Sequence, residues 1–267
     1  MPTFDHSHRV IRYDGGVLHP PVEDRLAIEE PLGIRVAGRM VSVTMRTPGH
    51  DDELAAGFLV GEGILRSREA VAAIRPCTQG PDGSAIEVLL RPGEEVDLAR
   101  LSRHVFTSSS CGICGAASLD AVRQEFPAVA AGPTVEAATI ARLPEILRAA
   151  QPTFEKTGGL HAAGLFDAQG TLLTAREDVG RHNAVDKVVG HAFLAGRLPL
   201  REHVLLVSGR ASFEIVQKAR AAGIPIVAAV SAPSSLAVEL AEESGITLVG
   251  FLRGGRFNVY TGADRLR

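Results

Sequence analysis

The chain has 267 residues, of which 45% are hydrophobic and 22% are charged, and this composition is typical of a globular protein with a substantial core. Its net charge of −3 and its aromatic content of 4% argue against a nucleic-acid-binding surface, because such surfaces are basic and stack bases on aromatic rings. Three cysteines are too few for a disulfide framework, and no stretch reaches the ~18 apolar residues of a membrane-spanning helix. We therefore expect a cytoplasmic protein that binds neither nucleic acid nor membranes.

The N-terminal half of the chain is rich in short strands. Residues 1–8 are expected to form a loose tail, and partial alternation of apolar and polar residues predicts strands between residues 9 and 47. Two further strands are predicted at 72–75 and 85–90, on either side of a Gly-Pro-Asp-Gly turn. Together these patterns indicate a small β-rich N-terminal domain, which we delimit at residues 1–130.

One helix interrupts these strands. It is expected to begin at Asp51, whose carboxylate suits the cap position, and apolar residues at helical spacing continue to Leu65. The segment also contains Gly57, Gly61 and Gly63, although glycine is a poor helix former. These glycines predict that the helix packs closely against the backbone of another element.

A pair of cysteines, Cys111 and Cys114, is the feature of the sequence with the clearest chemistry. Each is followed by a glycine, a Ser/Thr run precedes them, and a helix-like segment at 116–126 comes next. The reactive form of a thiol is the thiolate, and a helix N-terminus lowers a thiol pKa because it stabilises negative charge. The loop is therefore expected to present sulfur to another molecule.

Three uses of this thiol pair are open from the residues alone. A structural zinc site needs four ligands, and no second ligand pair is obvious in the sequence. A thioredoxin-like dithiol is expected at the end of an early strand in a βαβ unit. The third use is a single nucleophilic thiol that carries a sulfur atom. The remaining cysteine, Cys77, is interpreted as a spectator thiol.

The C-terminal half has a more regular pattern. A helix is predicted at 139–150 and a hairpin at 160–174, and helices beginning near residues 182, 211 and 234 then alternate with strands at 204–207, 226–230 and 246–249. This alternation predicts a mixed sheet that is covered by helices on both faces, in a domain that we delimit at residues 131–267. Ligands of such sheets tend to bind beyond the carboxyl ends of the strands.

One segment beyond these strand ends is suited to phosphate. It follows the last predicted strand and consists of Phe251, Leu252, Arg253, Gly254, Gly255 and Arg256. Glycine leaves backbone N–H groups open to a ligand, and arginine pairs with phosphate oxygens through two hydrogen bonds. A turn with solvated arginines is the simpler interpretation. Arg210 favours the phosphate site, because it also follows a strand and is expected at the same rim.

A second polar segment, residues 177–183, lies where a strand meets a helix. His182 at the helix start, oriented by Asp178, would form a general base, and a cap with a surface histidine is the structural alternative. His161 opens a strand and either faces the cysteine loop or is packed.

A zinc deaminase fits the order of elements, but that chemistry needs an H-x-E and a P-C-x-x-C motif at two helix starts. Neither motif is present there, so we expect neither deamination nor a metal site.

Several motifs occur together in this chain, in a fixed order. They lie at residues 55–63, 111–115, 159–163, 177–187, 208–210, 231–233 and 255–260. In these motifs, and through nearly its whole length, the chain resembles the FdhD family, whose members are sulfur-carrier proteins required for formate dehydrogenase activity. Ordered motifs at these spacings are far more specific than a single C-x-x-C.

The resemblance implies a cytoplasmic sulfurtransferase. Family members take sulfur from a cysteine desulfurase and pass it to the molybdenum cofactor, bis-molybdopterin guanine dinucleotide, before the cofactor is inserted into formate dehydrogenase. By motif matching, Cys111 holds the persulfide and the segment from Phe251 to Arg256 contacts the cofactor. The fold class is then α/β, or α+β overall, with a three-layer second domain similar to the cytidine deaminase fold. That likeness is consistent with the order of elements, although the two helix starts lack the zinc-binding motifs of a deaminase.

Further expectations concern assembly and the second thiol. A homodimer is expected to hold one guanosine-diphosphate-like end of the cofactor in each subunit, and GDP is expected to act as a partial mimic. Cys114 either helps to release the sulfur or only packs. Two rival functions remain open: a dithiol oxidoreductase that uses Cys111 and Cys114, and a non-catalytic module that binds a nucleotide or zinc.

Overall fold

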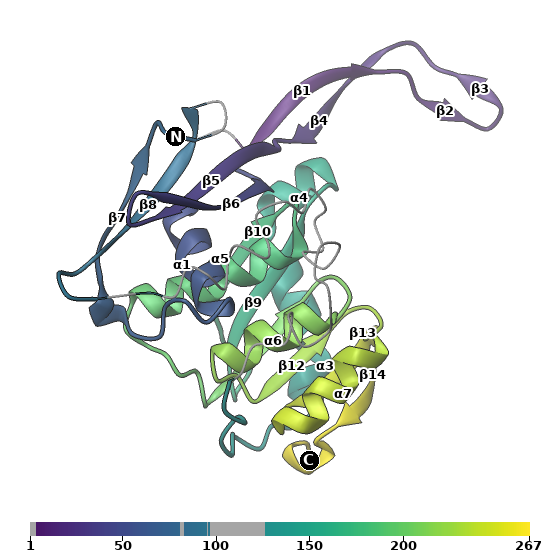
Figure 1. Ribbon diagram of the computed structural model, residues 1–267. Coiled ribbons are helices and arrows are strands. Elements are labelled where there is room, and N and C mark those ends of the chain that lie inside the picture. The colour runs from purple at the N-terminus through teal and green to yellow at the C-terminus, as the bar shows by residue number, and fades with distance from the viewer. Residues whose placement is uncertain (1–3, 81–82, 95, 97–125) are drawn as a thin grey trace.

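The computed structural model describes residues 4–80, 83–94, 96 and 126–267 (Figure 1). A four-stranded sheet and a six-stranded sheet are joined through a pair of packed helices, and a β-hairpin arm projects away from them (Figure 1). The chain is thus a mixed α/β protein. Within the described ranges, no helix is long and apolar enough to cross a membrane.

The four-stranded sheet comes from the N-terminal part of the chain. Its order is β6-β5-β8-β7, and its strands are β5 (Glu30–Val36), β6 (Arg39–Arg46), β7 (Val71–Cys77) and β8 (Ala85–Leu90). β5 and β8 are parallel, whereas the outer pairs are antiparallel. Helix α1 (Asp51–Gly61) packs against this sheet, in a core that includes Leu32, Ile34 and Leu54. A short 3-10 helix, η1 (Arg68–Ala70), leads into β7. The strands predicted at 72–75 and 85–90 are confirmed.

The start of α1 differs from the prediction. His50, not Asp51, takes the cap position, with a left-handed φ of 57° and no capping hydrogen bond from its side chain. Asp51 is the first helical residue, and its carboxylate accepts hydrogen bonds of 2.9 and 3.0 Å from Arg46. This ion pair holds the helix start against the end of β6. A cap and an ion-paired first residue look alike in the sequence, because both are acidic residues in front of an apolar run.

Six strands form the larger sheet, in the order β10-β9-β11-β12-β13-β14. They are β9 (His161–Asp167), β10 (Leu172–Asp178), β11 (His203–Val207), β12 (Ile226–Ala229), β13 (Thr247–Arg253) and β14 (Arg256–Thr261). β11, β12 and β13 are parallel to one another, and the other neighbours are antiparallel. The predicted hairpin and strands are confirmed. β14 lies outside the predicted elements, because the glycine pair after β13 turns the chain back into the sheet.

Helices cover both faces of the larger sheet, as predicted. α3 (Ala137–Ala149) packs on one face with strand residues such as Phe166 and Leu206. α5 (Arg181–Leu194), α6 (Phe213–Ala221) and α7 (Ser235–Ser244) cover the other face, where Leu205 and Val227 point. The short elements α4 (Pro152–Thr157) and η4 (Ala263–Arg265) complete this part of the chain. The likeness to the cytidine deaminase fold and the domain boundary near residue 130 stay predictions.

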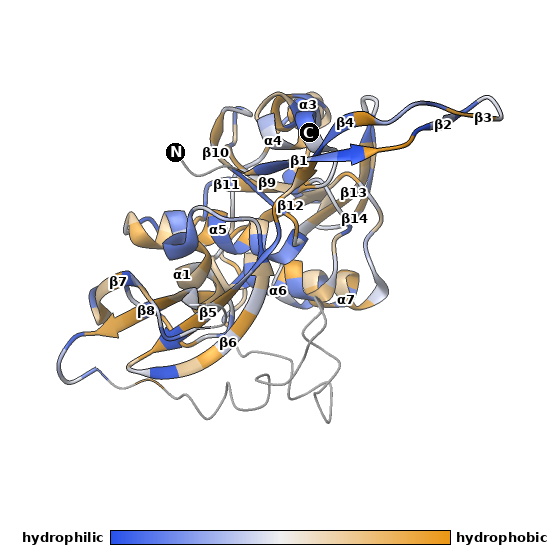
Figure 2. Cartoon of the chain, turned by 90° about the horizontal axis from the view of Figure 1, so that it is seen from above, coloured by the Kyte–Doolittle hydropathy of each residue, from blue (hydrophilic) through white to orange (hydrophobic). Residues whose placement is uncertain are grey.

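The N-terminal arm is an antiparallel ribbon of four strands. They are β1 (Asp5–Val10), β2 (Tyr13–Asp14), β3 (Val17–Leu18) and β4 (Val22–Ala27). β1 pairs with β4, and β2 with β3. The expected loose tail is therefore wrong from Asp5 onward. Most side chains of β1 are exposed, so its sequence lacks the alternation that reveals a strand with one buried face. The strands predicted after residue 9 are confirmed in the rest of the arm. Hydrophobic and hydrophilic residues occur side by side along it (Figure 2).

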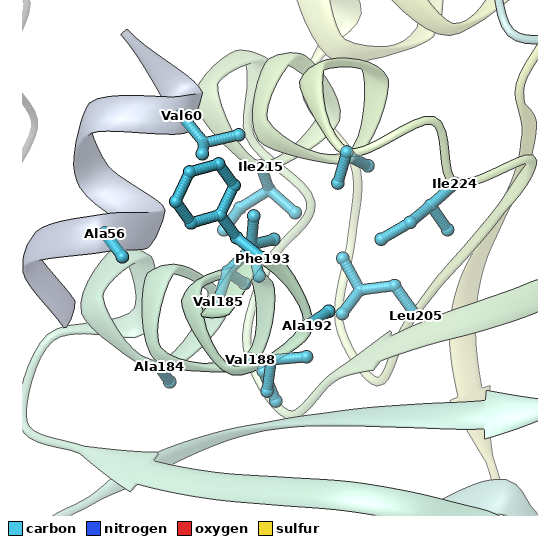
Figure 3. Close-up of a cluster of buried hydrophobic side chains, with 14 of the residues drawn as sticks. Ala56, Val60, Ala184, Val185, Val188, Ala192, Phe193, Leu205, Ile215 and Ile224 are labelled. Atoms are coloured by element: carbon cyan, nitrogen blue, oxygen red, sulfur yellow. The ribbon is translucent and has the colours of Figure 1, made fainter. Parts of the chain in front are cut away.

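Helices α1 and α5 cross at a close contact between backbones. A Cβ atom built on Gly57 would lie 1.8 Å from the carbonyl oxygen of Asp186, and one built on Gly190 would lie 1.8 Å from that of Glu53. The predicted close approach is thus confirmed at Gly57. Around the crossing, small and branched side chains of both helices fill a shared core, with Val60 of α1 beside Phe193 of α5 (Figure 3). This helix pair is the main contact between the two sheets.

Candidate functional site

One edge of the larger sheet gathers the segments that the sequence marks for chemistry. Because β11, β12 and β13 are parallel, the loops that follow them emerge at the same edge. Backbone hydrogen bonds connect these loops in series. The N–H of Ser208 donates to Ala162 over 2.9 Å, that of Ser231 to Gly209 over 3.2 Å, and that of Phe251 to Ser231 over 3.1 Å. The loops after β11, β12 and β13 therefore lie side by side.

The predicted phosphate segment is the hairpin that joins β13 to β14. Gly254 and Gly255 have φ values of 57° and 73°, and Arg253 pairs with Arg256 across the turn. Positive φ at both central residues is characteristic of a tight two-residue hairpin, which explains why both are glycine. Both arginines are exposed. The hairpin is therefore a turn with solvent-exposed arginines, as in the simpler interpretation. Both guanidinium groups are also accessible to an anion.

The two residues before this turn differ in accessibility. Leu252 is fully buried in the core beneath α3, so its side chain does not reach a ligand at the edge. Phe251 is 38% exposed and has a φ of 53°, a conformation that costs energy for a residue with a side chain. The register of β13 and β14 shifts at this point, between Gly250 and Arg253. The irregular backbone holds the aromatic ring at the surface, next to the hairpin turn.

A basic cluster lies at the other end of the same edge. It consists of His161 at the start of β9, Arg181 and His182 at the start of α5, and Arg210 after β11. A Cβ atom built on Gly209 would lie 3.4 Å from Nδ1 of His161 and 3.8 Å from Cβ of Arg181, so these residues surround the glycine closely. Burial, together with the positive charges of Arg181, His182 and Arg210, lowers the pKa of His161. This imidazole is therefore neutral at pH 7 and retains one nitrogen as a hydrogen-bond acceptor.

His182 has a different carboxylate partner from the one predicted. Its Nε2 atom lies 3.0 Å from Oε2 of Glu214 and 3.1 Å from the hydroxyl of Ser212. Burial alone would raise the pKa of Glu214, but hydrogen bonds from His182 and Ser212 lower it. Both neighbours contact the same nitrogen, so Ser212, His182 and Glu214 do not by themselves form a serine–histidine–carboxylate relay, in which the serine and the carboxylate contact different ring nitrogens. The predicted base oriented by Asp178 is wrong, because the orienting carboxylate is Glu214.

Asp178 belongs instead to a buried structural network. Its Oδ2 atom lies 2.7 Å from Nζ of Lys187 and accepts from the N–H of Thr47 over 3.2 Å. Its Oδ1 atom accepts from the N–H of Gly180 over 2.8 Å and from the amide of Asn183 over 2.9 Å. Lys187 also donates to the carbonyl of Thr47 over 2.9 Å. The network therefore fastens the start of α5 to the segment after β6 in the other half of the chain.

The two cysteines predicted as catalytic, Cys111 and Cys114, lie outside the described residues, so their roles stay predictions. Cys77 is described, as a half-buried free thiol at the end of β7. Where the chain is described again, after residue 125, the carbonyl of Pro127 accepts a hydrogen bond of 3.2 Å from Arg220 of α6. Within the described ranges, no group of three or more histidine, cysteine, aspartate or glutamate residues is placed to hold a metal ion.

Arg181 is a member of the basic cluster that the sequence pattern did not single out. In the segment 177–183 the histidine and the acidic residues predict chemistry, whereas a single arginine at a helix start is common on protein surfaces. The useful signal was its position. Arg181 is the first residue of a helix that follows a strand, at the edge where ligands of open α/β sheets bind.

Comparisons with known proteins agree over nearly the whole chain. The model of the FdhD/NarQ family matches residues 27–267. The sulfur carrier protein FdhD of Mycolicibacterium paratuberculosis is 58% identical over 250 residues, which cover 91% of this chain and 92% of the relative. The protein of the same name from Mycobacterium tuberculosis is 52% identical over 273 residues, which cover 97% and 98%. A crystal structure assigned as a formate dehydrogenase accessory protein of Desulfotalea psychrophila superposes with a TM-score of 0.79 at 28% identity, over 99% of this chain and all of that one.

Proposed function

The chain belongs to the FdhD/NarQ family, and from this we propose that it is a sulfur carrier that serves a formate dehydrogenase. The observation that carries the proposal is the high identity, over almost the full length, to proteins named sulfur carrier protein FdhD. The likeness to a formate dehydrogenase accessory protein supports the second part. The thiol pair at Cys111 and Cys114 supplies the chemistry that such a carrier needs.

Sulfur transfer takes place in two exchanges at Cys111. In the first, the Cys111 thiolate attacks the outer sulfur of a persulfide on a cysteine desulfurase. A new S–S bond forms on Cys111, the donor's S–S bond breaks, and the donor cysteine leaves as a thiolate. In the second exchange the acceptor supplies an electron pair to the outer sulfur, a bond between the acceptor and this sulfur forms as the S–S bond on Cys111 breaks, and Cys111 leaves as its thiolate. Persulfidation is a reversible modification, so the protein is reloaded for each cycle. In this sense it acts as a sulfurtransferase.

The acceptor is the molybdenum cofactor in its bis-molybdopterin guanine dinucleotide form, bound as a substrate. The hairpin between β13 and β14 suits its diphosphate, because Arg253 and Arg256 are exposed on the two sides of a glycine turn. Guanidinium groups bind phosphate oxygens through paired charged hydrogen bonds. Phe251 adds an exposed ring beside them. GDP carries the same diphosphate and base as one end of the cofactor and serves as its mimic.

The carrier is further proposed to act as a cytoplasmic homodimer in which each subunit holds one guanosine-diphosphate end. The arm supports self-association, because it exposes several large apolar side chains. Ile11 is 62%, Tyr13 70%, Val17 58% and Leu18 70% exposed. Association removes such surface from water. We further propose that this cofactor site lies in a C-terminal domain with the cytidine deaminase fold. This domain lacks the zinc ligands of a deaminase.

Replacing Cys111 by alanine is expected to abolish sulfur loading while the protein stays folded. The measurement is the intact mass after incubation with a cysteine desulfurase and free cysteine. The wild-type chain should gain the mass of one sulfur atom, and the Cys111→Ala variant should gain none. Cys77→Ala is the matched control and should load normally, because Cys77 is a half-buried thiol at the end of a strand. A Cys111→Ala variant that still supports formate dehydrogenase maturation would refute the assignment. A disulfide between Cys111 and Cys114 in place of a persulfide would favour the dithiol oxidoreductase.

Replacing Arg256 by alanine is expected to weaken GDP binding by about tenfold or more, because a charged hydrogen bond to phosphate stabilises a complex by roughly 1.5–3 kcal/mol. Isothermal titration calorimetry with GDP measures the change. Arg201→Ala is the control, because Arg201 is exposed in front of β11, at the opposite edge of the sheet. Equal GDP affinity in the Arg256→Ala and Arg201→Ala variants would reject the hairpin as the diphosphate site.

A further inference from the structure

The basic cluster contains an unused hydrogen-bond donor. The Nε atom of Arg181 is buried, and it has no hydrogen-bond partner among the described residues. A buried donor without a partner loses the free energy of its hydration, so proteins normally supply a partner or receive one from a ligand. Across the described part of the chain, no carboxylate forms an ion pair with Arg181 or Arg210. Among the described residues, Arg181 and Arg210 therefore have no carboxylate counter-ion, whereas His182 is paired with Glu214.

The acidic residues near the cluster are already engaged. Asp178 is bonded to Lys187, Asn183 and two backbone N–H groups, as described above. Oε2 of Glu214 contacts His182 and Ser212 on the side of α6, and its Oε1 atom is buried with no partner among the residues that the structure describes. Glu214 thus holds His182 in place, and neither carboxylate neutralises Arg181.

Backbone dipoles add to the positive potential at this point. α5 and α6 both begin at this edge of the sheet, since each follows a strand that ends there. The N-cap residue of α5, Gly180, has no side chain to cap the first turn, and the hydroxyl of Ser212, the N-cap residue of α6, accepts no hydrogen bond from it. The first N–H groups of a helix carry partial positive charge and attract anions. The dipoles of both helices and the charge of Arg181 therefore favour the same kind of ligand.

We propose that His161, Arg181 and Arg210 form a second anion subsite, which binds a phosphate-type oxyanion at the same sheet edge as the hairpin of Arg253 and Arg256. Arg181 and Arg210 supply charged donors, and Gly209 lies against both His161 and Arg181, so a side chain there would take up space next to these two residues. The inference deepens the proposed function and rests on it for the identity of the natural ligand.

The spacing of the two subsites suits one extended ligand. The loops after β11 and β13 are separated by the loop after β12, to which both are hydrogen-bonded at Ser231. Two interstrand spacings amount to about 10 Å, which exceeds the width of a single phosphate group. A ligand with two anionic groups, such as a dinucleotide, reaches both subsites at once. Free inorganic pyrophosphate binds either subsite separately.

The test is a calorimetric titration of the full chain at pH 7 with sodium pyrophosphate, and separately with GDP. Arg181→Gln is expected to lower the pyrophosphate affinity of the subsite about tenfold or more, and Arg181→Lys is expected to restore part of it, because the charge is kept. Arg201→Gln, at the opposite sheet edge, should change nothing. Gly209→Ala is a second probe. Its added methyl would make ordinary contacts of 3.4–3.8 Å, so the protein should fold with unchanged thermal stability and yet bind pyrophosphate more weakly.

The outcomes separate this inference from the proposed function. If wild type shows no pyrophosphate binding, or if Arg181→Gln and Gly209→Ala bind as tightly as Arg201→Gln, the subsite does not exist, whatever the Cys111→Ala experiment gives. If pyrophosphate binding falls in both variants while Cys111→Ala still supports formate dehydrogenase, the subsite stands and the sulfur-carrier assignment fails. Weaker GDP binding in Arg181→Gln identifies the nucleotide as a source of the anion. If Arg181→Gln weakens the binding of pyrophosphate but not that of GDP, the anion comes from free phosphate species and not from the nucleotide.

Discussion

Replacement of Asp178 by asparagine is expected to lower the free energy of unfolding by about 3–5 kcal/mol. Asp178 is 0% exposed and its partner Lys187 is 1% exposed, so the substitution leaves an ammonium group buried without its counter-charge. Asparagine has nearly the volume of aspartate, and the effect is therefore electrostatic and not a cavity. The loss also weakens the attachment of α5 to Thr47, because Lys187 bridges Asp178 and the Thr47 carbonyl.

Urea unfolding followed by circular dichroism measures this change. Glu136→Gln is the matched control, because Glu136 forms a 2.7 Å ion pair with Arg267 in which both side chains are more than half exposed. Exposed pairs stabilise proteins by at most about 1 kcal/mol. The double variant Asp178→Asn with Lys187→Met should recover much of the loss, since it removes both charges. If Asp178→Asn costs no more than Glu136→Gln, the buried pair does not hold the two halves together.

The regular part of the fold was predictable because burial leaves a periodic pattern. In the larger sheet, strand residues point alternately to α3 on one face and to α5, α6 and α7 on the other, so both faces are apolar. Short apolar strands separated by helices are the signature of that arrangement. Strand β1 has no such pattern, since it is held by backbone hydrogen bonds to β4 while most of its side chains remain in solvent. The sequence therefore predicts a loose tail at its start, whereas partial alternation does predict strands in the rest of the arm.

The candidate site was predictable in position but not in the roles of its residues. The rule that ligands bind beyond strand ends selected Arg210 and the segment 251–256, and their loops do lie along one edge. The segment 177–183 shows the limit of that reasoning. Asp178, Asn183 and Lys187 form a buried network, and a network of this kind uses the same residue types as a catalytic site. Burial and partners distinguish the two, and neither is encoded locally in the sequence.

Replacement of Gly57 by alanine is expected to destabilise the protein by at least about 3 kcal/mol, at the upper end of the range for overpacked cores. The new Cβ would lie 1.8 Å from the carbonyl oxygen of Asp186, and the opposing atoms belong to the backbone of α5. A side chain can rotate away from such a clash, but a helix backbone cannot, so α1 and α5 have to separate. Their shared core then loses contacts around Val60 and Phe193 (Figure 3).

Gly61→Ala, in the same helix, is the control for this substitution. Its Cβ would meet the side chain of Lys218 at 3.2 Å, and this side chain, although buried and ion-paired with Asp186, has to shift by only a few tenths of an ångström, with no backbone atom in the way. Gly57 lies inside the helix, where alanine gains about 1 kcal/mol of helix propensity over glycine, so the expected loss in Gly57→Ala has to come from the backbone contact. Urea unfolding should show a large loss for Gly57→Ala, an equal loss for Gly190→Ala and a much smaller loss for Gly61→Ala. Equal stability of the Gly57→Ala and Gly61→Ala variants would mean that the helices can separate without cost, and the crossing would then not be what joins the two sheets.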